Sequence, residues 1–250
     1  MTTMKEIAEK TGVSVSTVSL VLNKRDVGRV KPDIAQRVRQ TATDLGYKPN
    51  PLARSLRTSK TRILGFISEE VSTTPYAGGI ILGAQEAAST YGYMLITVST
   101  DGQASEESEI AALKRYGVDG FFYSKMSNRI ATVPKSLSDY PVVLVDATDA
   151  NNTLPSVEPD EFQIAYDATS RLIEAGCERI AYVGCSENMI AQDGRLAGYR
   201  AALEGTDHGF DASLVCNVLN NGPALRAVDA LFNTRNPDGF FCFNDARAWY

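Results

Sequence analysis

The side chains best suited to chemistry near the start of the chain are short hydroxyls and an amide, placed at helical spacing. They share a segment with Val18, Val21 and Leu22, whose spacing predicts the inward face of a helix. Short polar groups on the other face suit phosphate oxygens, contacts that position a helix on DNA without specifying sequence. The set comprises Ser14, Ser16, Thr17, Ser19 and Asn23.

The surrounding sequence predicts two short helices joined by a tight turn, which would position these side chains. Thr3 and Glu6 have the spacing of a capping box that opens the first helix, and Gly12 ends that helix. Ser14 then caps a second helix that runs from Val15 to about Asn23. Two helices of this length are too small to hold a core alone.

A third helix is predicted, and it would complete the core of this unit. Pro32 lies in its first turn and Gly46 ends it. Its apolar stripe comprises Ile34, Val38, Ala42 and Leu45. Three helices of this size and order are typical of a helix-turn-helix unit, whose second helix enters the DNA major groove.

The start of the second helix then points toward base edges. Val15 and Ser16 are the expected main base contacts, with Leu20 one turn later. Val15 and Leu20 offer only apolar contact, for example to a thymine methyl, or else they belong to the core of this unit. Ser14 is a helix cap, a phosphate contact, or both.

The same residues carry a family resemblance. Residues 5–14 (KEIAEKTGVS), followed by Ser16–Ser19 and Asn23, resemble the headpiece of the LacI/GalR family of bacterial repressors. Residues 45–50 (LGYKPN) with 53–56 (ARSL) resemble the segment that ends this headpiece and forms its hinge. The resemblance extends over essentially all 250 residues.

The resemblance implies a hinge helix that orders on operator binding and lies in the minor groove. Leu56 would wedge into the central base step, Ala53 would permit close approach, and Arg54 would meet a phosphate. Asn50 begins this DNA-contacting segment. The alternative is an ordinary flexible linker.

Charge divides the chain into two parts. Residues 1–62 hold 13 Lys and Arg against 5 Asp and Glu, a net charge of +8 inside a chain whose net charge is −5. Phosphate binding needs such a local cluster of cations. No apolar run is long enough to span a membrane and no signal peptide is evident, so a cytoplasmic, nucleoid-associated protein without membrane contact is expected.

From Arg62 onward, apolar strands alternate with helices, and the pattern restarts after Glu158. This predicts an N-terminal all-α helix-turn-helix headpiece followed by an α/β domain of two doubly wound subdomains, the periplasmic-binding-protein-like architecture that the resemblance also implies. The expected domains are a headpiece (1–48), a hinge or linker helix (49–61) and an effector-binding and dimerisation domain (62–250), lacking its C-terminal part because the chain stops just inside a helix begun by Asp245.

Candidate ligand contacts follow strand ends and family matches. Tyr76 is a stacking face after Pro75, and Ala77 stands where relatives often carry an aromatic ring, which implies a roomier pocket. Arg195, in the family segment 194–199 (GRLAGY), would contact the ligand with its guanidinium. Alternatively, Tyr76 is a core residue and Arg195 pairs with a surface acid. The remaining candidates are Met126, Asp146 (alternatively a cap) and Asn244.

Two functions remain in view. The first is a repressor that acts as a homodimer on a pseudopalindromic double-stranded operator and is controlled by a small molecule. The family resemblance implies a sugar or sugar derivative, and a nucleobase or another metabolite is the alternative. The second is an enzyme carrying a DNA-binding unit, but nucleotide-binding glycine motifs, a nucleophile elbow and metal-spaced ligands are all missing from the sequence. The sequence therefore predicts no enzyme activity, no catalytic residue, no metal and no cofactor. The four cysteines are expected to be reduced, small core residues.

Overall fold

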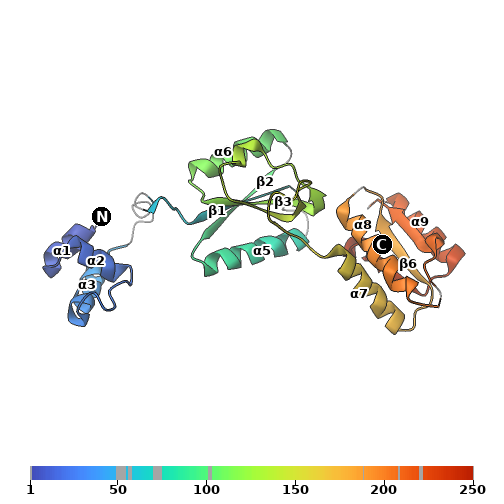
Figure 1. The fold of residues 1–250 in the computed structure, drawn as a ribbon, viewed down its shortest axis with the longest axis horizontal. Coiled ribbons are helices and arrows are strands. Elements are labelled where there is room, and N and C mark those ends of the chain that lie inside the picture. Colours follow the sequence, from blue (N-terminus) through green and yellow to red (C-terminus); the bar gives the residue numbers. More distant parts are fainter. Residues whose placement is uncertain are drawn as a thin grey trace. The chain divides into compact units, whose positions relative to one another are not determined.

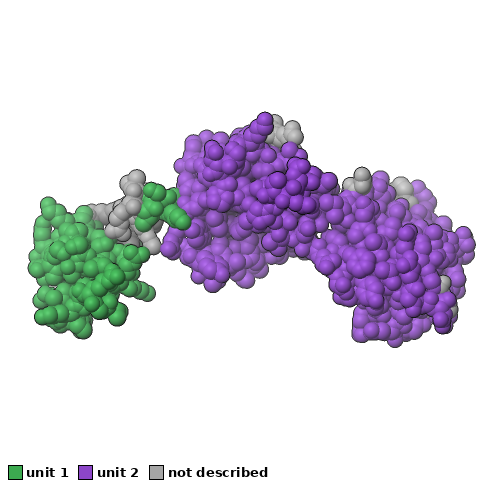
Figure 2. Space-filling view, in the orientation of Figure 1, with its two compact units in different colours: residues 1–61 green, residues 62–250 purple. Residues whose placement is uncertain are grey.

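The structure is a computed structural model that describes residues 2–48, 55, 58–69, 75–100, 103–187, 189–207, 209–219 and 222–249. It divides into two compact units, residues 1–61 and 62–250 (Figure 2). Each unit is described by itself. Among the helices described, none has both the length and the apolar character needed to cross a bilayer.

The first unit contains the three predicted helices. They are α1 (Met4–Thr11), α2 (Val15–Leu22) and α3 (Pro32–Asp44). The capping box is present, because Thr3 Oγ1 accepts from the Glu6 N–H at 3.3 Å and Glu6 accepts from the Thr3 N–H at 3.2 Å. Gly12 ends α1 at φ +68°, a left-handed conformation that costs glycine little.

A small apolar core joins these helices. Ile7, Val18 and Val38 are fully buried, and Val21 is nearly so. On α3 the buried positions are Ala35, Val38 and Ala42, while the predicted Ile34 and Leu45 pack against this core only partly buried. The helical spacing therefore predicted the correct face of α3, but the centre of the buried face lies about one residue away from the predicted one.

The second unit begins with a five-stranded parallel sheet in the order β2-β1-β3-β4-β5 (Figure 1). Helices α5 and α6 lie on opposite faces of this sheet. The strands are β1 (Ile63–Glu69), β2 (Met94–Thr100), β3 (Gly120–Ile130), β4 (Val142–Thr148) and β5 (Ser156–Val157), and the helices are α5 (Pro75–Thr90) and α6 (Gln103–Arg115).

A second parallel sheet, in the order β7-β6-β8, follows in the same unit. Each sheet reverses its winding beside its first strand, and doubly wound sheets bind ligands at the carboxyl ends of strands near such a reversal. The elements of this second lobe are α7 (Glu161–Glu174), β6 (Ile180–Cys185), α8 (Ile190–Glu204), β7 (Val215–Val218), α9 (Gly222–Arg235), β8 (Gly239–Cys242) and α10 (Asp245–Trp249).

Several details differ from the sequence prediction. Helix α9 and the short strand β5 were not predicted. The sequence pattern predicts a helix from near Arg195 and a strand that ends at Tyr123. Helix α8 instead begins at Ile190, and β3 continues past Tyr123 through a register shift between Ser124 and Arg129. All four cysteines are free, but only Cys185 is buried, so the expectation that all four are core residues was wrong.

Helices α7 and α8 approach each other unusually closely at two glycines. A Cβ atom on Gly198 would lie 2.1 Å from the carbonyl oxygen of Phe162, and one on Gly194 would lie 2.8 Å from the Cβ of Glu161. Backbone atoms cannot yield to such an overlap without moving the helix. These glycines therefore set the distance between α7 and α8.

Gly198→Ala is expected to lower the free energy of unfolding by about 1–3 kcal/mol, because the added methyl must push α7 away from α8. Urea unfolding followed by circular dichroism measures the change. Gly205→Ala is the control, since Gly205 ends the same helix at φ −83° and a Cβ there would meet only the Ala202 carbonyl oxygen, at 3.9 Å. That control should be neutral or stabilising by up to about 1 kcal/mol. Equal stability of the Gly198→Ala variant and the wild type would contradict the close-packing argument.

Candidate functional site

The start of α2 presents a group of hydroxyls to solvent. Ser14 Oγ accepts from the Thr17 N–H at 3.1 Å and therefore caps the helix. The same oxygen lies 2.7 Å from Ser16 Oγ and 2.9 Å from Thr17 Oγ1, so the three hydroxyls form one network. This network stands at the helix end that favours anions.

The predicted base contacts differ in exposure. Val15 is 46% exposed, so its side chain does not belong to the core of the unit. Leu20 is half-buried, which leaves both of its interpretations in place. Asn23 donates from its side-chain amide to the Ser19 carbonyl at 2.7 Å, so this amide also closes the end of α2.

A basic loop between α2 and α3 was missed by the sequence reasoning. Lys24, Arg25, Val27 and Arg29 line a hollow of about 430 Å³, and Val27 is 90% exposed. Asp26, a buried residue of the same loop, pairs with Arg39 of α3 at 2.5 Å. The cations of residues 24–31 indicated this loop in the sequence, but the prediction used them only as part of the net charge of the headpiece.

The predicted hinge contacts lie outside the described residues. This applies to Asn50, Ala53, Arg54 and Leu56. Their roles stay predictions from the family resemblance.

In the second unit, a hollow of about 490 Å³ lies where residues of both lobes meet. Asn128 of β3 contributes from the first lobe, while the chain entering α7 and the first turns of α8 contribute from the second. The lining residues are Asn128, Glu158, Pro159, Asp160, Glu161, Ile190, Asp193 and Gly194.

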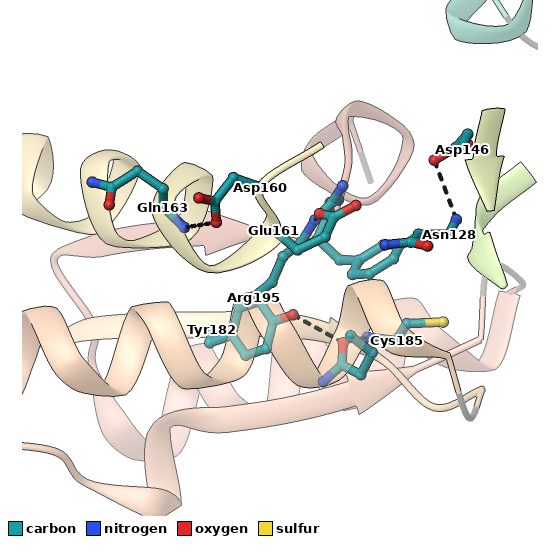
Figure 3. Close-up of polar contacts among 10 residues, drawn as sticks. Asn128, Asp146, Asp160, Glu161, Gln163, Tyr182, Cys185 and Arg195 are labelled. Carbon is teal, nitrogen blue, oxygen red and sulfur yellow. Dashed lines mark hydrogen bonds and ion pairs between the residues drawn. The ribbon is translucent and has the colours of Figure 1, made fainter. Parts of the chain in front are cut away.

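Arg195 does not line this hollow, but it pairs with the lining residue Glu161, and three contacts fix its side chain. Its Nε donates to Glu161 Oε2 at 2.6 Å, its Nη1 donates to the carbonyl oxygen of Phe243, and its guanidinium stacks 4.4 Å from the centre of the Phe243 ring. Figure 3 shows Arg195 reaching from α8 toward Glu161 at the start of α7. The side chain of Glu161 is only 6% exposed, so the acid that pairs with Arg195 is a buried one rather than a surface one.

Asp146 and Tyr76 come from the first lobe. Asp146 is buried at the end of β4 and accepts from the Asn128 N–H at 3.2 Å (Figure 3). Its backbone has φ +51°, a strained conformation for a residue other than glycine. Tyr76 is 53% exposed at the start of α5, so its ring is not a core residue.

Electrostatics link Tyr76 with the other two predicted ligand contacts. Partial burial raises the pKa of the Tyr76 phenol to about 12, the carboxylates of Asp146 and Glu161 add to that rise, and Arg195 opposes it. The phenol therefore stays a neutral hydroxyl near pH 7. The structure thus brings Tyr76, Asp146 and Arg195 near one another, although 119 positions separate the first from the last in the chain (76 to 195).

Three other predicted ligand contacts are less favourably placed. Ala77 is fully buried, so it offers no accessible surface here. Asn244 is exposed, but its Oδ1 accepts from the Arg247 N–H at 3.1 Å. Asn244 therefore caps α10, and Asp245 is the first helical residue rather than the cap. Nothing is described of the Met126 side chain, although its backbone belongs to β3.

The sequence reasoning also missed residues of this site. Glu161 and Phe243 fix Arg195, and Asp160 caps α7 by accepting from the Gln163 N–H at 3.0 Å (Figure 3). The adjacent acids at 160 and 161 signalled a helix start, but nothing local showed that Glu161 meets an arginine 34 residues away. Over the part of the chain that the structure describes, no group of three or more His, Cys, Asp or Glu side chains is arranged to hold a metal ion.

Comparison with known proteins agrees with this geometry. "Bacterial regulatory proteins, lacI family" matches residues 3–50, and "Periplasmic binding proteins and sugar binding domain of LacI family" matches residues 61–249. The HTH-type transcriptional regulator RegA of Clostridium saccharobutylicum is 35% identical over 218 residues, which are 86% of this chain and 64% of RegA. Catabolite control protein A of Priestia megaterium is 31% identical over an alignment of 257 positions, which covers 98% of this chain and 75% of that protein.

Solved structures show the same fold. A complex of the transcriptional regulator CelR with cellobiose has a TM-score of 0.61 at 26% identity, covering 99% of this chain and 75% of CelR. The lac repressor dimer bound to operator and the anti-inducer ONPF has a TM-score of 0.71 at 18% identity, again covering 99% and 75%, a likeness of fold alone.

The fold and the site define a class of protein in which a helix-turn-helix headpiece is joined to a periplasmic-binding-protein-like ligand domain. Its relatives are transcriptional regulators rather than enzymes. The chain belongs to the LacI family of bacterial regulatory proteins. It spans 64% of the length of RegA from C. saccharobutylicum.

Proposed function

We propose that this protein is a ligand-responsive repressor that binds a pseudopalindromic operator as a homodimer and is controlled by a sugar or sugar derivative. The observation that carries the proposal is the pairing of two sites in one chain. One is the exposed hydroxyl network at the start of α2, and the other is the hollow lined by Glu161, the acid that pairs with Arg195. The proposal places the protein on the chromosome, in the cytoplasm.

DNA contact is divided between two surfaces of the headpiece. The start of α2 enters the major groove, where Ser16 bonds a base edge and Val15 contacts a thymine methyl. The basic loop, Lys24, Arg25 and Arg29, meets phosphates beside it. The ion pair of Asp26 with Arg39 joins the loop to α3. The loop therefore loses less conformational entropy when it contacts phosphates.

Dimerisation is supported by the exposed apolar character of α5. Leu82 is 57% exposed, and Gly78, Gly79 and Gly83 would each leave an added Cβ with no neighbour within 4 Å. Ala77 and Ala88 face the sheet instead. A helix with one buried and one exposed apolar face fits a two-fold interface, in which the same surface of each copy meets the other.

Operator binding is tested with a duplex selected from a random pool and a scrambled duplex of equal length, over a range of salt concentrations. Ser16→Ala should weaken binding to the selected duplex alone, because only base contacts discriminate sequence. Arg25→Ala should weaken both duplexes similarly and reduce the slope of log K against log salt by about one, because one phosphate contact is lost. Lys135→Ala, an exposed lysine of the second unit, is the control and should change neither.

Two results would contradict the proposal. If the wild type bound scrambled and selected duplexes equally at physiological salt, sequence-specific regulation would be excluded. If Arg25→Ala left the salt slope unchanged, the basic loop would have no part in DNA contact.

A further inference from the structure

The loop between α2 and α3 holds one valine far out in solvent. Val27 is 90% exposed, and it lines the hollow of about 430 Å³ together with Lys24, Arg25 and Arg29. A single exposed apolar side chain is common on a protein surface. The position of Val27 is unusual because the three residues that share this lining with it are all cations.

The loop that carries Val27 is fixed by the neighbouring residue, Asp26. The Asp26 carboxylate is buried and pairs with Arg39 of α3 at 2.5 Å. The Asp26 carbonyl oxygen accepts from two N–H groups further along the loop, each at 2.9 Å. Gly28 follows at φ +71°, a left-handed conformation that turns the chain directly after Val27. Val27 is therefore held in place although nearly all of its own surface is exposed.

The position of the loop relative to α2 indicates what it meets on DNA. Helix α2 has eight residues and is therefore about 12 Å long, which is about the width of the major groove. When the start of α2 contacts base edges, its end lies near the edge of the groove, where the sugar–phosphate backbone runs. The loop begins directly after that end, since the Lys24 and Arg25 N–H groups still bond to carbonyl oxygens of α2.

We propose that Val27 packs against a deoxyribose of the operator backbone, between phosphates that the three cations contact. The inference rests on the proposed function, since it assumes that the headpiece binds DNA. Deoxyribose carbons are the apolar part of that backbone and lie between successive phosphates, so a valine among cations matches the order of groups along the strand. The contact depends neither on base sequence nor on salt concentration, because it involves neither a base edge nor a released counterion.

The contact is measured with Val27→Ala in the full chain, using the selected and scrambled duplexes over a range of salt concentrations. We expect the variant to bind both duplexes about fivefold more weakly, because less methyl surface is removed from water on binding. The slope of log K against log salt should stay at the wild-type value, unlike the slope of Arg25→Ala. Val27→Ile, which keeps a branched apolar side chain, should bind like the wild type.

Val157→Ala is the matched control, because Val157 is also an exposed valine, at 66%, but belongs to β5 of the second unit. It should bind both duplexes like the wild type. Circular dichroism checks that the headpiece of Val27→Ala remains helical, which is expected because the Val27 side chain lies almost entirely in solvent.

Hydroxyl-radical footprinting of the selected duplex, at saturating protein, gives a direct readout of the sugar. Hydroxyl radicals cleave DNA by removing hydrogen atoms from deoxyribose, so a protected position marks a covered sugar. Val27→Ala should lose protection at a position beside the major groove in each half of the operator. Val157→Ala should keep the wild-type pattern.

The inference is overturned if Val27→Ala binds both duplexes as tightly as the wild type, or if its footprint keeps every protected sugar. It is also overturned if only the selected duplex is bound more weakly, because Val27 then contacts a base, such as a thymine methyl. A changed salt slope in Val27→Ala excludes it as well, since the effect then comes from the neighbouring cations. Failure of the proposed function shows elsewhere, as equal binding of the two duplexes by the wild type or an unchanged salt slope in Arg25→Ala.

Discussion

Arg195→Ala is expected to abolish ligand-induced stabilisation and to lower the free energy of unfolding by about 3–5 kcal/mol. Two losses combine in this variant. The proposed ligand contact of Arg195 is removed, and Glu161 remains as a buried carboxylate without its 2.6 Å partner. Urea unfolding measures the stability, and the melting temperature with and without sugar measures the ligand response.

Arg171→Ala is the control, because Arg171 forms an ion pair of the same length with Glu174 but is 81% exposed. Exposed pairs contribute only about 0–1 kcal/mol, so this control should resemble the wild type. Adding Glu161→Gln to Arg195→Ala should recover part of the stability and none of the ligand response. If the ligand response survived in Arg195→Ala, the placement of the effector site would be wrong.

Leu56→Ala is expected to weaken operator affinity by about ten- to a hundredfold and to reduce the bend of the operator. This prediction rests on the family resemblance, in which Leu56 wedges between base pairs of the minor groove. Burying a leucine side chain contributes about 2–3 kcal/mol, which corresponds to that range of affinity. Gel phasing measures the bend, and fluorescence anisotropy measures the affinity.

The headpiece should remain folded in this variant, because the buried core described there is formed by residues of α1, α2 and α3. Leu52→Ala, in the same linker, separates a specific wedge from a general loss of apolar surface. An unchanged bend in Leu56→Ala would exclude the wedge and would favour a plain linker.

Local signals in the sequence were enough to predict the headpiece. The Thr3–Glu6 capping box, the glycine at position 12 and the serine cap at position 14 each depend on residues within about one turn. The strands were predictable for a similar reason, since continuous apolar runs such as Val142–Val145 indicate strands buried on both faces. The outward position of Val15 followed from the inward stripe of Val18 and Val21.

The site in the second unit was only partly predictable. Tyr76, Asp146 and Arg195 were predicted as contacts, but the partner of Arg195 depends on a packing distance that two glycines create between α7 and α8. Periodicity does not encode such a tertiary distance. Helix α9 was also missed, although Leu225, Val228, Leu231 and Phe232 have helical spacing in the sequence.

The predicted ligand contacts are divided between two lobes, and this division has a consequence for the length of the effector. Arg195 and Glu161 move as one body because α7 and α8 are locked together, whereas Tyr76 and Asp146 are anchored to the other sheet. Only a molecule long enough to contact both groups can bind differently when the distance between them changes. A shorter molecule that contacts one of the two groups alone would occupy the site without changing the distance between the lobes. It would therefore act as an antagonist of the longer effector.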